Sequence, residues 1–399
     1  MSATTRFAVL GAALALVATS GSAALAQKKY DTGASDTEIK IGNIMPYSGP
    51  ASAYGIIGRT EAAYFKKIND AGGINGRKIK LIVEDSGYDP KRAVLASQKL
   101  IEKDKIFAMV GPMGSPTVLA AQDILFDAGV LQLFPLTAAE FTFKFDPAKP
   151  QERLKFNNIL PYVESTRAAL KHMIEWKKFA KPCIMHQDDE YGKSVLDGFN
   201  QQTAAMKLTP ASVTSYKRGA SDFSAQVAKM KSDGCDLVVL GTVIRETIGA
   251  MGEAKKLGWD VTFLGATPTN VLEVPALGKE AVEGLYAAAA FEIPYPDTAK
   301  GKAKDWLDNY KKAFGADANT QAIIGYNAMM TFAHYVNKAG KDLTGQKVLD
   351  AMESGDVFQD IFNSPPTKFS KTNHLASTVT QVQQVKGGRW VLVKEGLMF

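Results

Sequence analysis

The spacing of apolar residues changes repeatedly along the first part of this chain. Short apolar runs typical of strands alternate with longer amphipathic segments typical of helices, and Gly, Pro and Asp residues mark the junctions. This order predicts an α/β fold in which a doubly wound parallel sheet is covered by helices on both faces. The predicted strands are Glu38 to Met45, Lys78 to Glu84, Ile106 to Val110 and Val130 to Phe134.

The same alternation starts again after Pro161 and predicts a second doubly wound parallel-sheet lobe. Beyond it, the helix patterns from Thr298 to Ala313 and from Thr320 to Lys338 do not belong to the second lobe, so we expect the chain to return to the first. The predicted strands here are Pro182 to His186, Ser212 to Tyr216, Asp236 to Leu240, Val261 to Leu264 and an extended run from Tyr286 to Ile293.

The C-terminal segment from Phe369 to Trp390 alternates polar and apolar residues around Gly387-Gly388, which predicts a hairpin. If this hairpin docks on the second lobe, three strands cross between the lobes and form a hinge. We therefore expect lobe 1 to hold residues 27–156 and 287–365, and lobe 2 to hold residues 157–286 and 366–399. Such a hinge lets two rigid bodies close over a ligand.

Residues 1–26 have the layout of a cleavable signal peptide. Arg6 precedes an apolar run from Phe7 to Ala18, and small residues follow up to Ala24-Leu25-Ala26. The apolar run is too short to span a bilayer, and no other run of about 18 apolar residues follows it. The first cysteine is Cys183, so none lies at the cleavage site to carry a lipid. We expect a periplasmic protein that does not insert into the membrane.

The charge pattern argues against a nucleic-acid partner, and the hydrophobic content bears on the number of cores. The formal charge is +6, from 47 basic minus 41 acidic residues, and the two signs are interspersed without a long block of either. This pattern predicts a mixed, solvated surface and no nucleic-acid partner. The hydrophobic content of 46% is enough for two cores.

The chain contains two cysteines, Cys183 and Cys235. Both precede apolar strand-like runs, so they could lie side by side on adjacent parallel strands, and an oxidising compartment permits a disulfide. The sequence leaves two alternatives open: a bridge between them, or two small buried thiols that only pack.

An ordered series of short segments carries a resemblance that spans nearly all of the mature chain. The segments are Ser35 to Gly42 with Ser48-Gly49-Pro50, Ala71 to Arg77, Asp85 to Pro90, His186 to Gly192, Asp222-Phe223-Ser224, and the ending with His374 and Gly388-Arg389-Trp390. Together they resemble the branched-chain amino-acid (Leu/Ile/Val-binding) type of ABC-transporter substrate-binding protein. The resemblance implies a type I periplasmic binding fold, a small-molecule ligand in the cleft between the lobes, and a permease in the inner membrane as partner.

The resemblance also implies which loops hold the ligand. Judged from the local sequence, Ser115 is a helix N-cap before Pro116. In the family, however, this loop offers a hydroxyl and backbone N–H groups to the ligand's carboxylate. Tyr54 and Tyr191 match cleft tyrosines of the family, although each could serve packing only. The ligand-binding residues implied are Tyr54, Met113, Gly114, Ser115, Leu136, Thr137, Ala138 and Tyr191.

Two departures from the family pattern change the expected ligand. The family places a glutamate where this chain has Thr267, and a tyrosine where it has Val243. Without that carboxylate, a buried ammonium would cost several kcal/mol. We therefore expect Val243 and Thr267 to contact a ligand with a carboxylate and an apolar body but no amino group, for example an aromatic acid. Arg245 is a candidate second anion partner, with an exposed surface position as the alternative.

Signatures of other functions are missing. The chain has no His-Glu-x-x-His, Gly-x-Ser-x-Gly, Cys-x-x-Cys or phosphate-loop motif, and its four histidines are widely spaced. We expect a monomer without enzymatic activity, metal site or cofactor. Two alternatives to the organic-acid receptor stay open: a branched-chain or other amino-acid binding protein of the same transporter class, and a periplasmic sensory module that signals to a membrane receptor.

Overall fold

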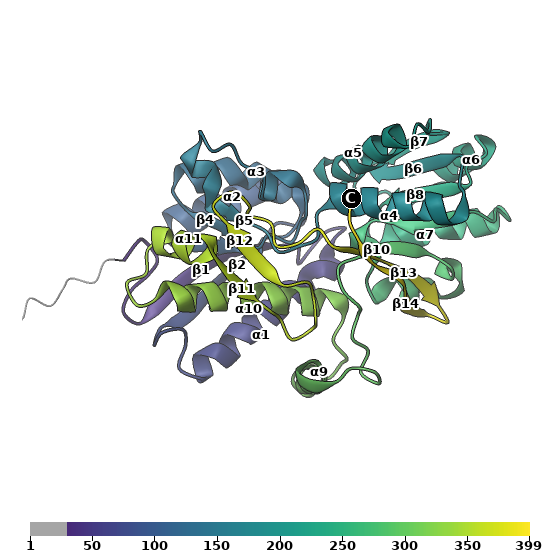
Figure 1. Cartoon of the computed structure of the whole chain (residues 1–399). Coiled ribbons are helices and arrows are strands. Elements are labelled where there is room, and N and C mark those ends of the chain that lie inside the picture. The colour runs from purple at the N-terminus through teal and green to yellow at the C-terminus, as the bar shows by residue number, and fades with distance from the viewer. Residues whose placement is uncertain (1–29) are drawn as a thin grey trace, which may run out of the picture.

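The computed structural model describes residues 30–399, so the predicted signal peptide lies outside the described residues. Two α/β lobes lie beside each other, and the chain passes between them several times (Figure 1). None of the described helices is long and apolar enough to cross a membrane.

The first lobe is built on a five-stranded sheet in the order β2-β1-β3-β4-β5, with every pair parallel. Helices α1 and α10 pack together on one face of this sheet and α2 and α3 on the other. The strands are β1 (Glu38–Met45), β2 (Lys78–Asp85), β3 (Ala108–Val110), β4 (Leu131–Leu133) and β5 (Lys155–Phe156). The helices are α1 (Ile56–Asp70), α2 (Pro90–Glu102), α3 (Ser115–Asp127), α10 (Thr320–Ala339) and α11 (Gly345–Glu353).

The second lobe repeats this order as β7-β6-β8-β9-β10, all parallel, and adds β13 and β14 antiparallel beside β10. Its strands are β6 (Pro182–Gln187), β7 (Ser212–Tyr216), β8 (Leu237–Gly241), β9 (Thr262–Gly265), β10 (Tyr286–Ala289), β13 (Thr380–Lys386) and β14 (Arg389–Leu397). Its helices are α4 (Tyr162–Lys177), α5 (Glu190–Ala205), α6 (Ser224–Ser232), α7 (Ile244–Lys256) and α8 (Glu273–Gly278). The predicted pair of doubly wound parallel sheets is confirmed.

Smaller elements complete the chain. Helix α9 (Gly301–Phe314) follows β10, and β11 (Ser354–Phe358) pairs with β12 (Thr367–Ser370) in a two-stranded sheet. Single turns of 3-10 helix lie at Ser52–Gly55, Glu140–Thr142, Pro150–Leu154, Thr267–Thr269 and Lys279–Val282.

Two crossing segments pair with each other between the lobes. Asn157, directly after β5, receives a backbone hydrogen bond at its carbonyl from Ala376 at 3.0 Å and donates its N–H to His374 at 2.9 Å. The Asn157 side chain also donates to the carbonyl of Thr137 at 2.6 Å. The third crossing follows β10. The paired segments are therefore tied directly to the loop after β4.

Two details of the predicted lobe limits differ from the structure. Residues 287–289 lie in β10, which pairs with β9 of the second sheet, so the chain leaves that sheet after Ala289 and not before Ala287. Phe369 lies in β12 and packs on Phe156 of the first lobe, with ring centroids 5.2 Å apart. The predicted hairpin therefore begins at Thr380, although its turn at Gly387-Gly388 is where the sequence places it.

The cysteines form a disulfide. Cys183 begins β6 and Cys235 precedes β8, and since these strands are neighbours, the two Cα atoms lie 5.9 Å apart.

The two lobes touch at both sides of the space between them. The Arg218 guanidinium, after β7, donates to the carbonyl of Tyr88, after β2, at 3.0 Å. On the side of α8, the backbone N–H of Leu272 donates to the Thr320 hydroxyl at 3.1 Å. The lobes are therefore in a closed arrangement.

Candidate functional site

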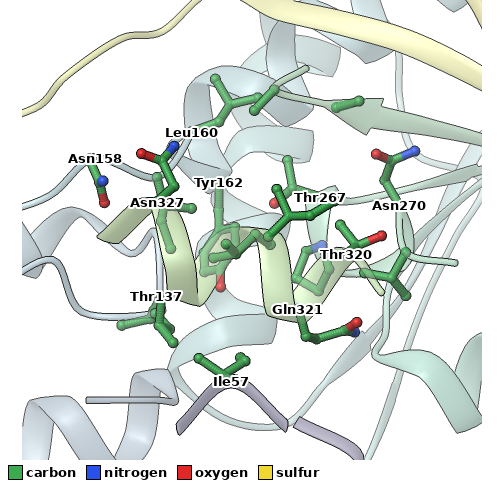
Figure 2. Close-up of a pocket in the computed structure, with 18 of the residues that line it drawn as sticks. Ile57, Thr137, Asn158, Leu160, Tyr162, Thr267, Asn270, Thr320, Gln321 and Asn327 are labelled. Carbon is green, nitrogen blue, oxygen red and sulfur yellow. The ribbon is translucent and has the colours of Figure 1, made fainter. Parts of the chain in front are cut away.

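The parallel strands of both sheets end at one cleft between the lobes, and Figure 2 shows it in close-up. The cleft encloses about 1350 Å³, its open mouth included. Loops after β1 to β4 form one wall, loops after β6, β8 and β9 form the other, and the crossing segments with the first turns of α10 close the side. Ligands of doubly wound sheets bind at the carboxyl ends of the strands, so this cleft is the candidate site.

Nine of the ten predicted ligand-binding residues line the cleft. They are Tyr54, Met113, Gly114, Ser115, Leu136, Thr137, Tyr191, Val243 and Thr267. The tenth, Ala138, is fully buried behind the lining, and its carbonyl accepts the backbone N–H of Tyr162 at 3.1 Å. Their contact with a ligand remains our proposal.

Of the two alternatives for Arg245, the structure agrees with the exposed surface position and not with the role of anion partner. Its side chain is 60% exposed on α7 and is not part of the cleft lining, whereas the neighbouring Glu246 is buried. Successive residues of a helix point about 100° apart. Because Glu246 faces the interior, Arg245 is turned toward solvent.

The N-terminus of α3 forms the end of the cleft that suits an anion. Gly114 has φ +104°, and a Cβ atom there would lie 2.4 Å from the Tyr88 ring, so only glycine fits. Gly114, and not Ser115 as predicted, is the N-cap. Ser115 is the first helical residue, and its hydroxyl lies 2.6 Å from that of Thr137. Two buried hydroxyls therefore stand at the positive end of a 13-residue helix.

A buried polar pair anchors the loop that precedes α3. The Asn43 side chain donates to Glu61 at 2.9 Å and to the carbonyls of Val110 and Gly111 at 2.8 and 2.9 Å. Burial raises the pKa of Glu61 well above its ordinary value. Burial therefore disfavours a negative charge on Glu61, which lies beneath the anion-binding end of the cleft.

Four tyrosines give the cleft its aromatic walls. Tyr162 and Tyr191 meet edge to face with ring centroids 5.0 Å apart, and the Tyr191 hydroxyl donates to the carbonyl of Thr242 at 2.9 Å. The Tyr54 hydroxyl is buried near the backbone of Ile244. Tyr88 and Tyr162 were missed by the sequence analysis, although each closely follows a strand end, which was a usable signal.

No charged side chain of residues 30–399 lines the cleft. Thr267 and Val243 stand where they were predicted, so the far wall lacks the family's carboxylate. Burial raises the pKa of Tyr54, and the buried Glu246 and the half-buried Glu273 of the second lobe raise it further, although neither lines the cleft.

The family model described as "Periplasmic binding protein" matches residues 38–389. The chain belongs to this family. A leucine-, isoleucine-, valine-, threonine- and alanine-binding protein of Pseudomonas aeruginosa is 28% identical, over 80% of this chain and 83% of that protein. The Leu/Ile/Val-binding protein of Escherichia coli K12 is 28% identical, over 67% of this chain and 74% of that protein. The predicted resemblance to the branched-chain amino-acid type is confirmed.

Solved structures of the family share the fold. A branched-chain amino-acid ABC transporter protein from Thermus thermophilus with bound valine superposes with a TM-score of 0.80 at 19% identity, covering 91% of this chain and 97% of that one. A fatty-acid ABC transporter substrate-binding protein from Thermomonospora curvata gives a TM-score of 0.82 at 22% identity, covering 93% and 95%. The predicted type I periplasmic binding fold is confirmed.

Proposed function

We propose that this protein is the periplasmic receptor of an ABC importer, and that it captures an amino acid with an apolar side chain by closure of the two lobes. The closed, loaded form then docks on the inner-membrane permease. The ligand contacts we propose are the lining residues of both lobes, with the carboxylate at Ser115 and Thr137. This proposal takes the amino-acid alternative of the sequence analysis in place of the aromatic acid, because both relatives reported above are named for binding amino acids.

The distribution of charge around the cleft is the observation that carries the amino-acid assignment. The first lobe presents the positive end of α3, whereas the second lobe holds two acids behind the lining, the buried Glu246 and the half-buried Glu273, and both raise the pKa of Tyr54. No cation lines the cleft among the described residues. A ligand with a carboxylate alone would add an unbalanced negative charge, which costs several kcal/mol when buried. A zwitterion adds no net charge and matches both ends.

Curated relatives support the same ligand class, since two of them are named for binding leucine, isoleucine and valine. Apolar residues on both walls, including Met113, Leu136 and Val243, suit an aliphatic side chain. Ligand binding selects the closed form because the ligand touches both lobes only when they are closed.

Calorimetric titration of the refolded, ligand-free protein tests this proposal. Leucine, isoleucine and valine are compared with the desamino analogue of leucine, which keeps the carboxylate and the side chain, and with phenylacetate. We expect leucine to bind about 100-fold more tightly than its desamino analogue. Tighter binding of the two acids than of every amino acid would overturn the ligand assignment and restore the organic-acid prediction.

A further inference from the structure

A group of hydrogen bonds joins the two lobes where the N-terminus of α10, in the first lobe, faces the start of α8, in the second. Asn319 Nδ2 donates to Glu273 Oε1 at 2.5 Å, and the backbone N–H of Leu272 donates to the Thr320 hydroxyl at 3.1 Å. Gln321 faces the same carboxylate, and with its nitrogen turned toward the acid, Nε2 lies 2.7 Å from Oε1 and 2.8 Å from Oε2. We call these five residues the latch.

The half of the latch that belongs to the second lobe is tied to that lobe's sheet. The indole N–H of Trp390, in β14, donates to the carbonyl of Val271 at 2.9 Å. Asn270 Nδ2 donates to Gln383 Oε1, in β13, at 3.1 Å. The segment that leads into Glu273 is therefore fixed to the second lobe.

The half that belongs to the first lobe is equally well fixed. Asn319 is the N-cap of α10, and its Oδ1 accepts the backbone N–H of Ala322 at 2.9 Å. Because Oδ1 is used in this way, the amide nitrogen is oriented to donate to Glu273. Helix α10 packs tightly on α1, since a Cβ atom on Gly325 would lie 2.9 Å from the Ile57 side chain.

The Glu273 carboxylate depends on groups of the other lobe for its balance. It is half-buried, and it stands at the positive end of the 20-residue helix α10. Burial raises the pKa of Glu273, and hydrogen bonds from its own backbone, Asn319 and Gln321 oppose this rise. In the closed arrangement the amides and the helix end of the first lobe therefore stabilise the ionised acid of the second.

The latch lies at a seam between the two walls of the cleft. Thr320 and Gln321 line the cleft from the first lobe, and Asn270 and Val271 line it from the second (Figure 2). Opening the cleft at this seam would admit water to the ligand.

Neither Asn319 nor Glu273 lines the cleft itself. Because the two halves of the latch are fixed to different lobes, widening of the cleft at the seam pulls the carboxylate away from its amide donors. We propose that the latch stabilises the closed form and slows the release of the bound amino acid; this inference rests on the proposed function.

Asn319→Asp tests the latch. Aspartate keeps the N-cap of α10 but replaces the amide donor with a second carboxylate that faces Glu273. Leucine binding is followed by stopped-flow intrinsic fluorescence at a pH of about 8, which disfavours a proton shared by the two acids. We expect leucine to dissociate about tenfold faster and to associate at a rate within about twofold of the wild type. A direct effect of the added charge on the ligand's ammonium would instead slow dissociation.

Three further variants separate the latch from other effects of this change. Asn319→Ser also caps the helix, removes the amide donor without adding a charge, and should raise the dissociation rate about threefold. Glu273→Gln combined with Asn319→Asp exchanges donor and acceptor at constant charge and should return the rate to within about threefold of the wild type. Thr344→Asp adds the same charge at the N-cap of α11, outside the cleft lining, and should keep both wild-type rates.

The outcomes separate the latch from the proposed function. If leucine binds the wild type but both Asn319 variants release it at the wild-type rate, the latch is overturned and the function stands. The same holds if the double variant releases leucine as fast as Asn319→Asp does. If no amino acid binds the wild type, the proposed function fails, and the latch fails with it because no bound amino acid is retained.

Discussion

Replacing Ser115 with alanine removes one hydroxyl from the anion-binding end of the cleft. This hydroxyl is buried at the first residue of α3 and lies 2.6 Å from the Thr137 hydroxyl. In the proposed complex it donates to the ligand's carboxylate, so Ser115→Ala removes a hydrogen bond to a charged group. The backbone N–H groups and the dipole of α3 remain in the variant.

The expected loss of leucine affinity follows from the kind of hydrogen bond that Ser115→Ala removes. A hydrogen bond to a charged group contributes about 1.5–3 kcal/mol, so leucine should bind about 10- to 150-fold more weakly. Thr137 also loses its neighbour, which should lower the free energy of unfolding by about 1 kcal/mol. Affinity should therefore fall much more than stability.

Ser97→Ala is the matched control. Ser97 is as buried as Ser115, but its hydroxyl has no partner and lies on α2, away from the cleft. Calorimetry should give this variant the leucine affinity of the wild type, and urea unfolding should report the stability of all three proteins. If Ser115→Ala binds leucine within about twofold of the wild type, the Ser115 hydroxyl does not hold the carboxylate and the assignment of this contact is wrong.

Three further changes test other parts of the structure. Replacing Cys183 and Cys235 together with serine should lower the free energy of unfolding by about 4 kcal/mol, because the bridge spans 52 residues, and an unchanged urea midpoint would contradict the bridge. Arg218→Ala should weaken leucine binding about two- to fivefold, since the closed form loses the bond to Tyr88, and equal affinities by calorimetry would exclude that role. Burial lowers the pKa of His374, so below pH about 6.5 the unfolded chain binds a proton that the folded protein does not. The stability of the wild type relative to His374→Gln should therefore fall as the pH is lowered from about 7 to about 5. Thermal unfolding measures this difference, and a difference that stays constant with pH would refute the prediction.

The sheets could be predicted because strands buried on both faces are continuous apolar runs. Strand β1 has the predicted bounds, and so does β7, although β7 is an edge strand that alternates buried and exposed residues. The hairpin start could not be predicted, because Phe369 fits the alternation of a strand yet is drawn into the first lobe's core beside Phe134 and Phe156. Tertiary packing overrides local pattern there.

Site residues on loops after strands could be placed from sequence, because the carboxyl ends of parallel strands meet at one edge. The wall made by α10 could not, since Ile323 and Asn327 reach the cleft only after the chain returns from the second lobe. The acids Glu246 and Glu273 were missed for a related reason. They act through space on Tyr54 and carry no motif.

A crystal structure of the protein with bound leucine tests the central claim most directly. The account predicts the leucine carboxylate within hydrogen-bond distance of Ser115 at the N-terminus of α3, and its ammonium on the side of Tyr54. A carboxylate held by the second lobe, or a ligand outside the cleft, would contradict it.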